Sequence, residues 1–136
     1  MPKGPLPAEL AEFLTKPNPA VIATLNADGH PNTVATWYVW EDGRVLVNMD
    51  ESRARLDNLR RDGRVSLTVL DEASWYNHVS LRGRVAAIEE DADLADIDRI
   101  STHYTGSPYG DRERNSVSAW IEVERWHAWR GGSSWR

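Results

Sequence analysis

The stretch AVIATLNADGHPNTVATWYVWEDGRVLVNM, residues 20–49, contains two Asp-Gly pairs that separate segments rich in β-branched and aromatic residues. Asp28-Gly29 and Asp42-Gly43 predict hairpin turns, because glycine readily adopts the positive φ that tight turns require. Strand-forming residues on both sides of each turn favour pairing between neighbours in the chain. We therefore expect an antiparallel meander of three strands, 20–26, 31–41 and 45–49.

Outside this meander, apolar residues recur at helical spacing in some segments and alternate in others. Gly83 lies inside a long alternating segment and predicts a bulge or a bend there. In the last alternating segment, the pattern puts Ile121 on one face and Trp126 on the other. Strands interrupted by helices in this order predict a mainly β (α+β) fold with a closed or partly closed antiparallel barrel. The expected helices are 7–15, 52–61 and 91–104, and the further strands are 64–70, 75–88 and 116–130.

The length of 136 residues indicates one domain, which we expect to span 1–130, followed by a flexible tail, 131–136. The absence of cysteine excludes disulfides, thiolate catalysis and Cys-ligated metal centres. The net charge of −5 argues against nucleic acid as a partner. No apolar stretch approaches the roughly 18 residues of a membrane span, and residues 1–7 do not resemble a signal peptide, so we expect a cytoplasmic protein.

The segment 53–64 holds five arginines and two aspartates, although the chain as a whole is acidic. Arg53 and Arg55 fall in the first turn of the expected helix, where each cation opposes the helix dipole by roughly 0.3–1 kcal/mol. A bound anion would reverse that sign, because it would meet free backbone N–H groups, the Ser52 hydroxyl as a helix cap, and two guanidinium groups. This pattern predicts a phosphate or carboxylate site. The alternative is a solvated helix whose arginines are screened by nearby carboxylates.

Motifs for other chemistry are weak or missing. The four histidines form no His-Glu-x-x-His pattern, so we expect no metal site. There is no Gly-x-Ser-x-Gly elbow, no Walker loop and no Gly-x-Gly-x-x-Gly, so a nucleotide-like cofactor requires another scaffold. The aromatic strand 33–40 has a composition that suits a flat ring ligand, although an ordinary half-buried strand has the same composition.

The order of these elements, together with SRARLDNLRRDGRVSL at residues 52–67 and VSLRGRV at 79–85, resembles the pyridoxamine 5′-phosphate oxidase-like split barrels. Within them it is most similar to the class B enzymes that use the deazaflavin coenzyme F420, and the resemblance extends over residues 6–129. It implies a six-stranded antiparallel split β-barrel with three short helices. It also implies a homodimer with two cofactor sites at the interface.

The resemblance further implies which residues bind the cofactor. Many relatives have lysine at the position of Arg55, where arginine keeps the charge and adds bidentate geometry. The implied wall beside the ring comprises Thr33, Val34, Ala35, Thr36 and Trp37, continued by Asn48, Met49 and Asp50. The implied contacts to the phosphate and acidic tail are Ser52, Arg53, Arg55 and Asn58, and those from the other subunit are Trp75, Tyr76, Asn77 and His78.

The resulting functional hypothesis is an F420-dependent oxidoreductase that transfers a hydride between the cofactor and a small conjugated or quinone-like substrate. Tyr38, His78 and Tyr104 are candidate proton donors. Three alternatives stay open: an FMN-dependent oxidoreductase of the same fold, a non-catalytic module that binds a flavin, a deazaflavin or haem, and a structural dimer without a ligand. For haem, His78 or His127 is the candidate ligand.

Overall fold

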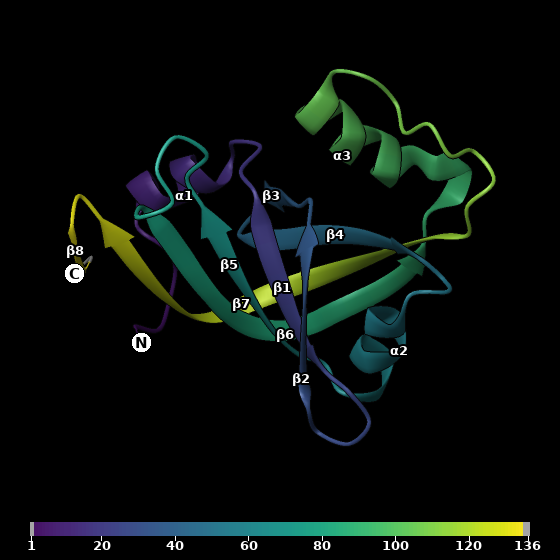
Figure 1. Ribbon diagram of the computed structural model, residues 1–136, viewed down its shortest axis with the longest axis horizontal. Coiled ribbons are helices and arrows are strands. Elements are labelled where there is room, and N and C mark those ends of the chain that lie inside the picture. The colour runs from purple at the N-terminus through teal and green to yellow at the C-terminus, as the bar shows by residue number, and fades with distance from the viewer. Residues whose placement is uncertain (1, 135–136) are drawn as a thin grey trace.

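The computed structural model describes residues 2–134, which form one strongly curved antiparallel sheet with three α-helices (Figure 1). The mainly β, α+β class is therefore confirmed. The helices are α1 Ala8–Leu14, α2 Ala54–Arg61 and α3 Ala95–Thr105, the last preceded by a one-turn 3-10 helix, η1 Ala92–Leu94. The strands are β1 Ala20–Leu25, β2 Pro31–Thr36, β3 Val39–Glu41, β4 Arg44–Asp50, β5 Arg64–Leu70, β6 His78–Glu90, β7 Ser116–Arg130 and β8 Ser133–Ser134.

The strand order is β2-β1-β5-β6-β7-β4-β3, with β8 paired to β7. The predicted single strand 31–41 is wrong, because it divides into β2 and β3 at opposite ends of the sheet. The predicted number of six strands is also wrong, since seven lie along this path. Within residues 2–134 no ladder joins β2 to β3, so the barrel stays open on that side.

The division of the strand occurs at Trp37-Tyr38. Tyr38 is fully buried, and its hydroxyl donates to the carbonyl of Leu14 at the end of α1, 2.9 Å away. Trp37 instead stacks on Tyr104 of α3, with ring centroids 5.2 Å apart. These two residues point to different helices, and a straight, regularly paired strand does not accommodate both contacts.

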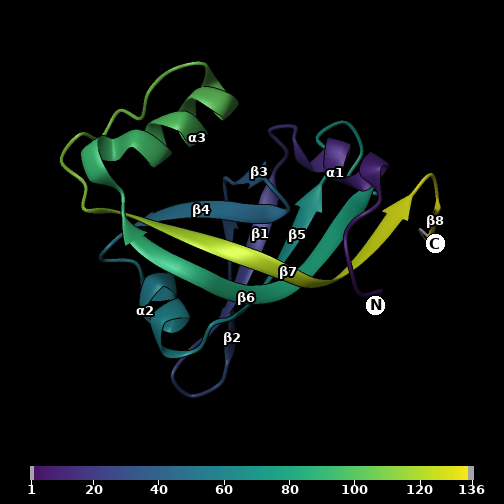
Figure 2. The ribbon, with the colours of Figure 1, turned by 180° about the vertical axis from the view of Figure 1, so that it is seen from behind.

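The core lies inside the curved sheet and is closed by α1 and α2. Alternate residues of β1 and β5 point inward, as the expected period of two requires. Leu56 and Leu59 of α2 are 0% and 2% exposed, and each contributes roughly 1.5–3 kcal/mol by burial. Figures 1 and 2 show α1 and α3 over one side of the sheet and α2 on the other.

The bulge expected at Gly83 is confirmed. The register between β6 and β7 shifts between Arg82 and Gly83, and a Cβ at Gly83 would lie 1.9 Å from the carbonyl oxygen of Glu122. Before this shift the buried hydrophobic residues of β7 have odd numbers, and after it they have even numbers. Trp126 is consequently buried, at 5% exposed, together with Ile121, so the prediction that they lie on opposite faces is wrong.

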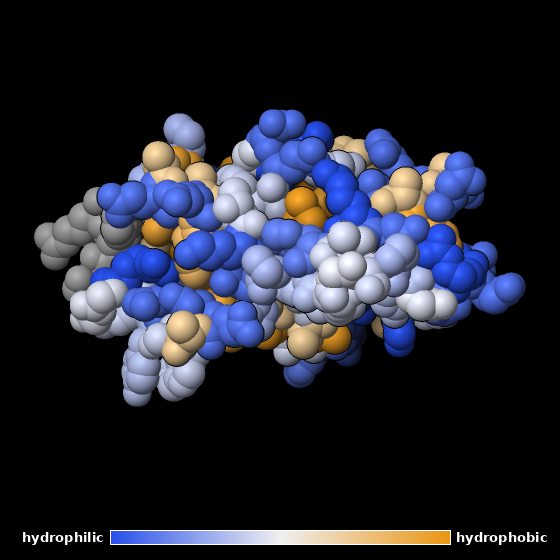
Figure 3. All heavy atoms as spheres, turned by 90° about the horizontal axis from the view of Figure 1, so that it is seen from above, coloured by the Kyte–Doolittle hydropathy of each residue, from blue (hydrophilic) through white to orange (hydrophobic). Residues whose placement is uncertain are grey.

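Several boundaries differ from the expected ones. The strand predicted at 75–88 begins at His78, and Trp75 to Asn77 belong to the preceding turn. Ser133 and Ser134, within the tail expected to be flexible, pair with Arg130 and Trp129, while 135–136 lie outside the described residues. No helix in the described part of the chain has the length and apolar character to cross a membrane. The face seen from above α1 and α3 is mainly hydrophilic, with apolar side chains in separate small patches (Figure 3).

Candidate functional site

A cavity of about 550 Å³ lies where the end of β2, the β4–α2 connection and α3 meet. Seven residues implied as cofactor contacts line it: Ala35, Thr36, Trp37, Asn48, Asp50, Arg53 and Arg55. The sequence interpretation did not assign the other lining residues to the cofactor, and they include Pro17, Pro19, Glu72, Ile97, Ile100, Tyr104, Tyr109 and Arg114. Of these, Tyr104 was expected only as a candidate proton donor, and Ile97 and Ile100 belong to the expected helix 91–104.

One wall of the cavity is aromatic. The rings of Trp37 and Tyr104 are stacked, with an interplanar angle of 13°, and Tyr109 meets Trp37 edge-on at 6.2 Å. The Tyr104 hydroxyl donates to the carbonyl of Asn18 at 2.7 Å and accepts from the backbone N–H of Tyr38 at 3.3 Å. Burial raises the pKa of Tyr104 to about 12. This wall is therefore rigidly held and uncharged.

The candidate proton donors have structural partners. The Tyr38 hydroxyl donates to Leu14 and accepts from the Asn18 side-chain amide at 3.3 Å, and burial raises its pKa well above the usual range. Nδ1 of His78 lies 3.2 Å from the carbonyl oxygen of Tyr76, outside the cavity lining. The hydroxyls of Tyr38 and Tyr104 thus hold α1, the β2–β3 connection and α3 together.

The basic wall of the cavity is built by the start of α2. Arg53 is the N-cap residue, Arg55 lies in the first turn, and no residue in the described chain forms an ion pair with either. The pKa of Arg55 is lowered, first by desolvation and then by the charges of Arg53 and Arg114. The arrangement favours an anion, because an anion would offset both the desolvation and the repulsion.

The expectation that Ser52 caps α2 is wrong. Its hydroxyl donates to Oδ1 of Asp50 at 2.7 Å, and its backbone N–H donates to the same oxygen at 3.0 Å. A carboxylate is a stronger acceptor than water, so it fixes the hydroxyl as a donor. These hydrogen bonds lower the pKa of Asp50, and the helix begins two residues later, at Ala54.

Asn48 lies at the centre of a buried polar network beside the cavity. Its Nδ2 donates to Oδ2 of Asp91 at 3.2 Å and to Oγ of Ser118 at 3.1 Å. Its Oδ1 accepts from Nη2 of Arg114 at 3.0 Å and from Oγ of Ser116 at 2.9 Å. The amide therefore uses both donor hydrogens and both acceptor positions, which fixes its orientation.

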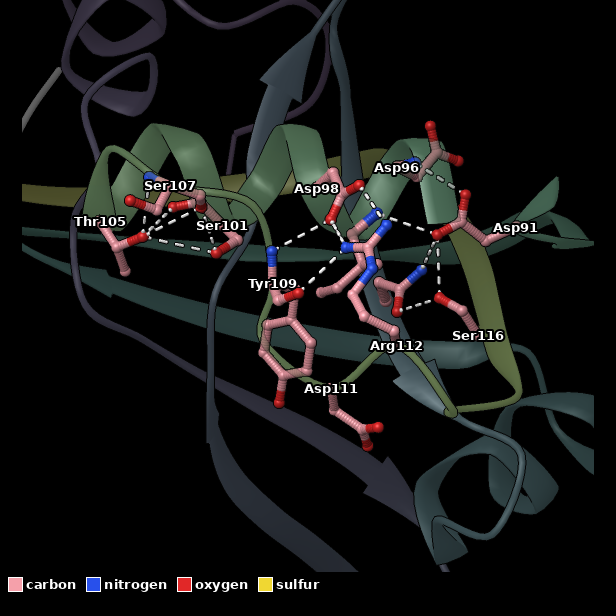
Figure 4. Close-up of polar contacts among 12 residues, drawn as sticks. Asp91, Asp96, Asp98, Ser101, Thr105, Ser107, Tyr109, Asp111, Arg112 and Ser116 are labelled. Atoms are coloured by element: carbon pink, nitrogen blue, oxygen red, sulfur yellow. Dashed lines mark hydrogen bonds and ion pairs between the residues drawn. The ribbon is translucent and has the colours of Figure 1, made fainter. Parts of the chain in front are cut away.

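The segment 106–115 contributes Tyr109 and Arg114 to the cavity lining and is anchored to α3. Asp98 accepts from the backbone N–H of Tyr109 at 3.0 Å and from both terminal nitrogens of Arg112, at 2.6 and 3.0 Å (Figure 4). Ser101 donates to the carbonyl of Ser107 at 2.8 Å. The hydrogen bonds from Arg112 hold the pKa of Asp98 below its usual range. This anchoring carries Tyr109 to the aromatic wall.

The remaining implied residues do not line the cavity. The side-chain amide of Asn58 donates to Thr24 at 3.0 Å and to Asn26 at 2.9 Å, which fastens α2 to β1. Met49 is 1% exposed within the core. Trp75 and Tyr76 stack on each other at 4.4 Å and are both 63% exposed. The others outside the lining are Thr33, Val34, Ser52, Asn77 and His78.

The two candidate haem ligands, His78 and His127, lie on the neighbouring strands β6 and β7 and outside the cavity lining. Residues 2–134 contain no group of three or more histidines and carboxylates placed to hold a metal ion.

Comparison with known proteins places these features in context. The family model described as Pyridoxamine 5′-phosphate oxidase matches residues 6–130. No curated protein matches the chain.

Three solved structures are similar over most of the chain. An F420 reductase is 22% identical, with a TM-score of 0.78, over 93% of this chain and 98% of that one. A conserved hypothetical protein from Mycobacterium tuberculosis is 27% identical, with a TM-score of 0.73, over 93% and 86% of the two chains. HupZ from Group A Streptococcus is 19% identical, with a TM-score of 0.68, over 96% and 100%.

Proposed function

Because the chain belongs to the pyridoxamine 5′-phosphate oxidase family, we propose that it is an oxidoreductase that uses coenzyme F420 to reduce a small conjugated or quinone-like molecule. The observation that carries this proposal is the combination, in one cavity, of a stacked aromatic wall and arginines that form no ion pair within residues 2–134. A planar ring joined to an anionic chain has the complementary chemistry.

The residues present fit such a cofactor. Thr36 and Trp37 supply a flat surface beside the proposed ring, and Arg53 and Arg55 supply charge-assisted donors for its anionic groups. Bound and reduced, F420 supplies a hydride to the substrate. The single phosphate of FMN suits the same donors, so we include FMN as the competing cofactor in the test.

The protein itself holds and shields the reactants. Ile97 and Ile100 of α3 are 4% and 1% exposed and line the cavity, so this side of the site excludes water. Tyr109 also lines it, and its hydroxyl has no hydrogen-bond partner among residues 2–134. Since the hydroxyls of Tyr38 and Tyr104 are engaged, we assign Tyr109 as the residue that holds a proton toward the substrate.

The test is a fluorescence titration with F420 and with FMN. We expect F420 to bind, and Arg53→Gln and Arg55→Gln each to weaken it by about tenfold or more. Arg84→Gln is the matched control, because Arg84 is 60% exposed on β6 and outside the cavity. Tighter binding of FMN than of F420 would assign the protein to FMN chemistry, and binding of neither would refute the proposal.

We also propose that the protein is a homodimer in which the exposed Trp75–Tyr76 pair contacts the second subunit. Two stacked, largely exposed aromatic rings are unusual on a free surface and typical of interfaces. Light scattering should give twice the chain mass of 15.4 kDa. The double variant Trp75→Ser, Tyr76→Ser should shift the mass toward the monomer at low concentration, and an unchanged mass would contradict the assignment.

A further inference from the structure

Arg114 lies in the segment before β7 and lines the cavity together with Arg53 and Arg55 from the start of α2. We propose that Arg114 is a third anion-binding residue, which shares one acidic group of the bound cofactor with Arg55 and is positioned by Asn48 and Asp91. The inference rests on the proposed function, since it deepens the assignment of the same site.

The guanidinium of Arg114 is fixed in position by two contacts, but few of its N–H groups have an acceptor among the described residues. Its face lies over the Tyr109 ring, 4.8 Å from the centroid, and Nη2 donates to Oδ1 of Asn48 at 3.0 Å. Its Nε is buried and has no acceptor among the described residues. An arginine has five N–H donors in a fixed planar arrangement, so most of its hydrogen-bonding capacity remains for a ligand.

The hydrogen bond to Asn48 fixes the position of Arg114. Arginine only donates hydrogen bonds, so it requires the Oδ1 side of the amide, and Asp91 requires the Nδ2 side. Asp91 is 7% exposed, and it also accepts from the backbone N–H groups of Asp96 at 2.7 Å and Ile97 at 2.9 Å. The amide is thus locked between a carboxylate bonded to α3 and the guanidinium that faces the cavity.

The charge around Arg114 favours an anion. Arg53, Arg55 and Arg114 line one cavity, and none of them forms an ion pair in the part of the chain that the structure describes. The lining also contains Asp50 and Glu72, but the oxygens of Asp50 already accept from Ser52 and Asn115. The charge of Arg114 is also among the causes that lower the pKa of Arg55.

The decisive experiment compares F420 with the same deazaflavin ring and ribityl chain lacking the phosphate and acidic tail. We expect Arg114→Gln to weaken F420 by about tenfold or more and to leave the affinity for the truncated ring within about twofold. Arg114→Lys should recover part of the loss, since it keeps the charge without the planar fork. The control Arg84→Gln should change neither affinity.

The positioning role is tested with Asn48→Leu, whose side chain has the same branching and cannot accept a hydrogen bond. We expect it to weaken F420 as much as Arg114→Gln does, and the double variant to lose nothing further. Ser116→Ala, which removes the hydroxyl that donates to Asn48 and Asp91, is the milder variant if Asn48→Leu does not fold. Additive losses in the double variant would contradict positioning through Asn48.

The outcomes separate this inference from the proposed function. If Arg53→Gln and Arg55→Gln weaken F420 but Arg114→Gln does not, the proposed function stands and the inference is wrong. If Arg114→Gln weakens F420 and the truncated ring equally, Arg114 has only a structural role. If the protein binds FMN in place of F420, a loss of affinity for FMN but not for riboflavin still supports Arg114, and binding of none of these ligands refutes both.

Discussion

The starts of α2 and α3 follow opposite rules. At α3, both carboxylate oxygens of Asp91 accept backbone N–H groups of the first turn, from Asp96 and Ile97. At α2, the N-cap residue is Arg53, Arg55 lies in the first turn, and no side chain among residues 2–134 caps the helix. One helix therefore has a negative group where the dipole favours it, and the other has two positive groups where the dipole opposes them.

This difference shows how stability and binding are divided within one small domain. α3 is stabilised at its start by hydrogen bonds within the chain. α2 is stabilised instead by the burial of Leu56 and Leu59 and by the hydrogen bonds from Asn58. The helix therefore does not depend on a side chain that caps its first turn. Packing offsets an unfavourable helix start, and that start stays available to a ligand.

We expect the largest effect on stability from removing the carboxylate that accepts hydrogen bonds at the start of α3. Asp91→Ala removes a buried acceptor of four hydrogen bonds and leaves the donors of Asp96, Ile97, Asn48 and Ser116 without it. We expect the free energy of unfolding to fall by about 2–5 kcal/mol, measured by urea denaturation. Glu90→Ala, which removes the adjacent exposed carboxylate, is the control. A loss below about 1 kcal/mol would show that the cap contributes little.

The second effect is a loss of stability at alkaline pH, where the Tyr104 hydroxyl of α3 ionises. Burial raises the pKa of Tyr104 to about 12, whereas tyrosine in the unfolded chain ionises near pH 10. The contribution of Tyr104 to the free energy of unfolding is complete below about pH 10 and is lost as the pH rises toward 12, because the folded state then binds more protons than the unfolded state. Denaturation at pH 9 and pH 11.5 should show this fall. Tyr104→Phe should reduce the fall, and an unchanged pH dependence would contradict the assignment.

A smaller effect of opposite sign is expected at α2. Arg53→Glu and Arg55→Glu each place a negative charge where the helix dipole favours it, so we expect the free energy of unfolding to rise by roughly 0.3–1 kcal/mol each. Affinity for F420 should be lost in the same variants. Retained affinity would refute the anion site, and reduced stability would show that the arginines have a structural role as well.

The smallest effect is expected in the segment 106–115, which is anchored to α3 through Asp98. Arg112→Ala breaks an exposed ion pair with Asp98 and should cost less than about 1 kcal/mol in unfolding free energy. Hydrogen exchange at the Tyr109 amide should nevertheless become faster, because Asp98 then holds this segment through fewer bonds. In Arg99→Ala, which breaks another exposed pair on α3, exchange at Tyr109 should not change. Equal exchange rates in the two variants would contradict the anchoring.

The comparison also shows which parts of the site were predictable. The arginines of α2 were identified because their charge conflicts with a local rule, and Gly83 because glycine inside a strand marks a bulge. The prediction that Ser52 caps the helix was wrong because the carboxylate of Asp50, two residues earlier, takes the hydroxyl hydrogen. Arg114 and Tyr109 gave no local signal, since they lie in a polar segment without periodicity. The hydrogen-bonding partners of Asn48 identify Arg114, and the ring contacts with Arg114 and Trp37 identify Tyr109. Both observations require coordinates.

The sequence by itself determined the three helices and most of the strands along the chain, the two Asp-Gly hairpins and the basic helix start. These depend on turn geometry, side-chain periodicity and the helix dipole, which act over a few neighbouring residues. Only the tertiary structure decided that residues 31–41 divide between the two ends of the sheet. It also decided that Arg114 meets Asn48 across 66 positions of sequence. Such contacts depend on the order of strands in the folded sheet, and no local preference encodes that order.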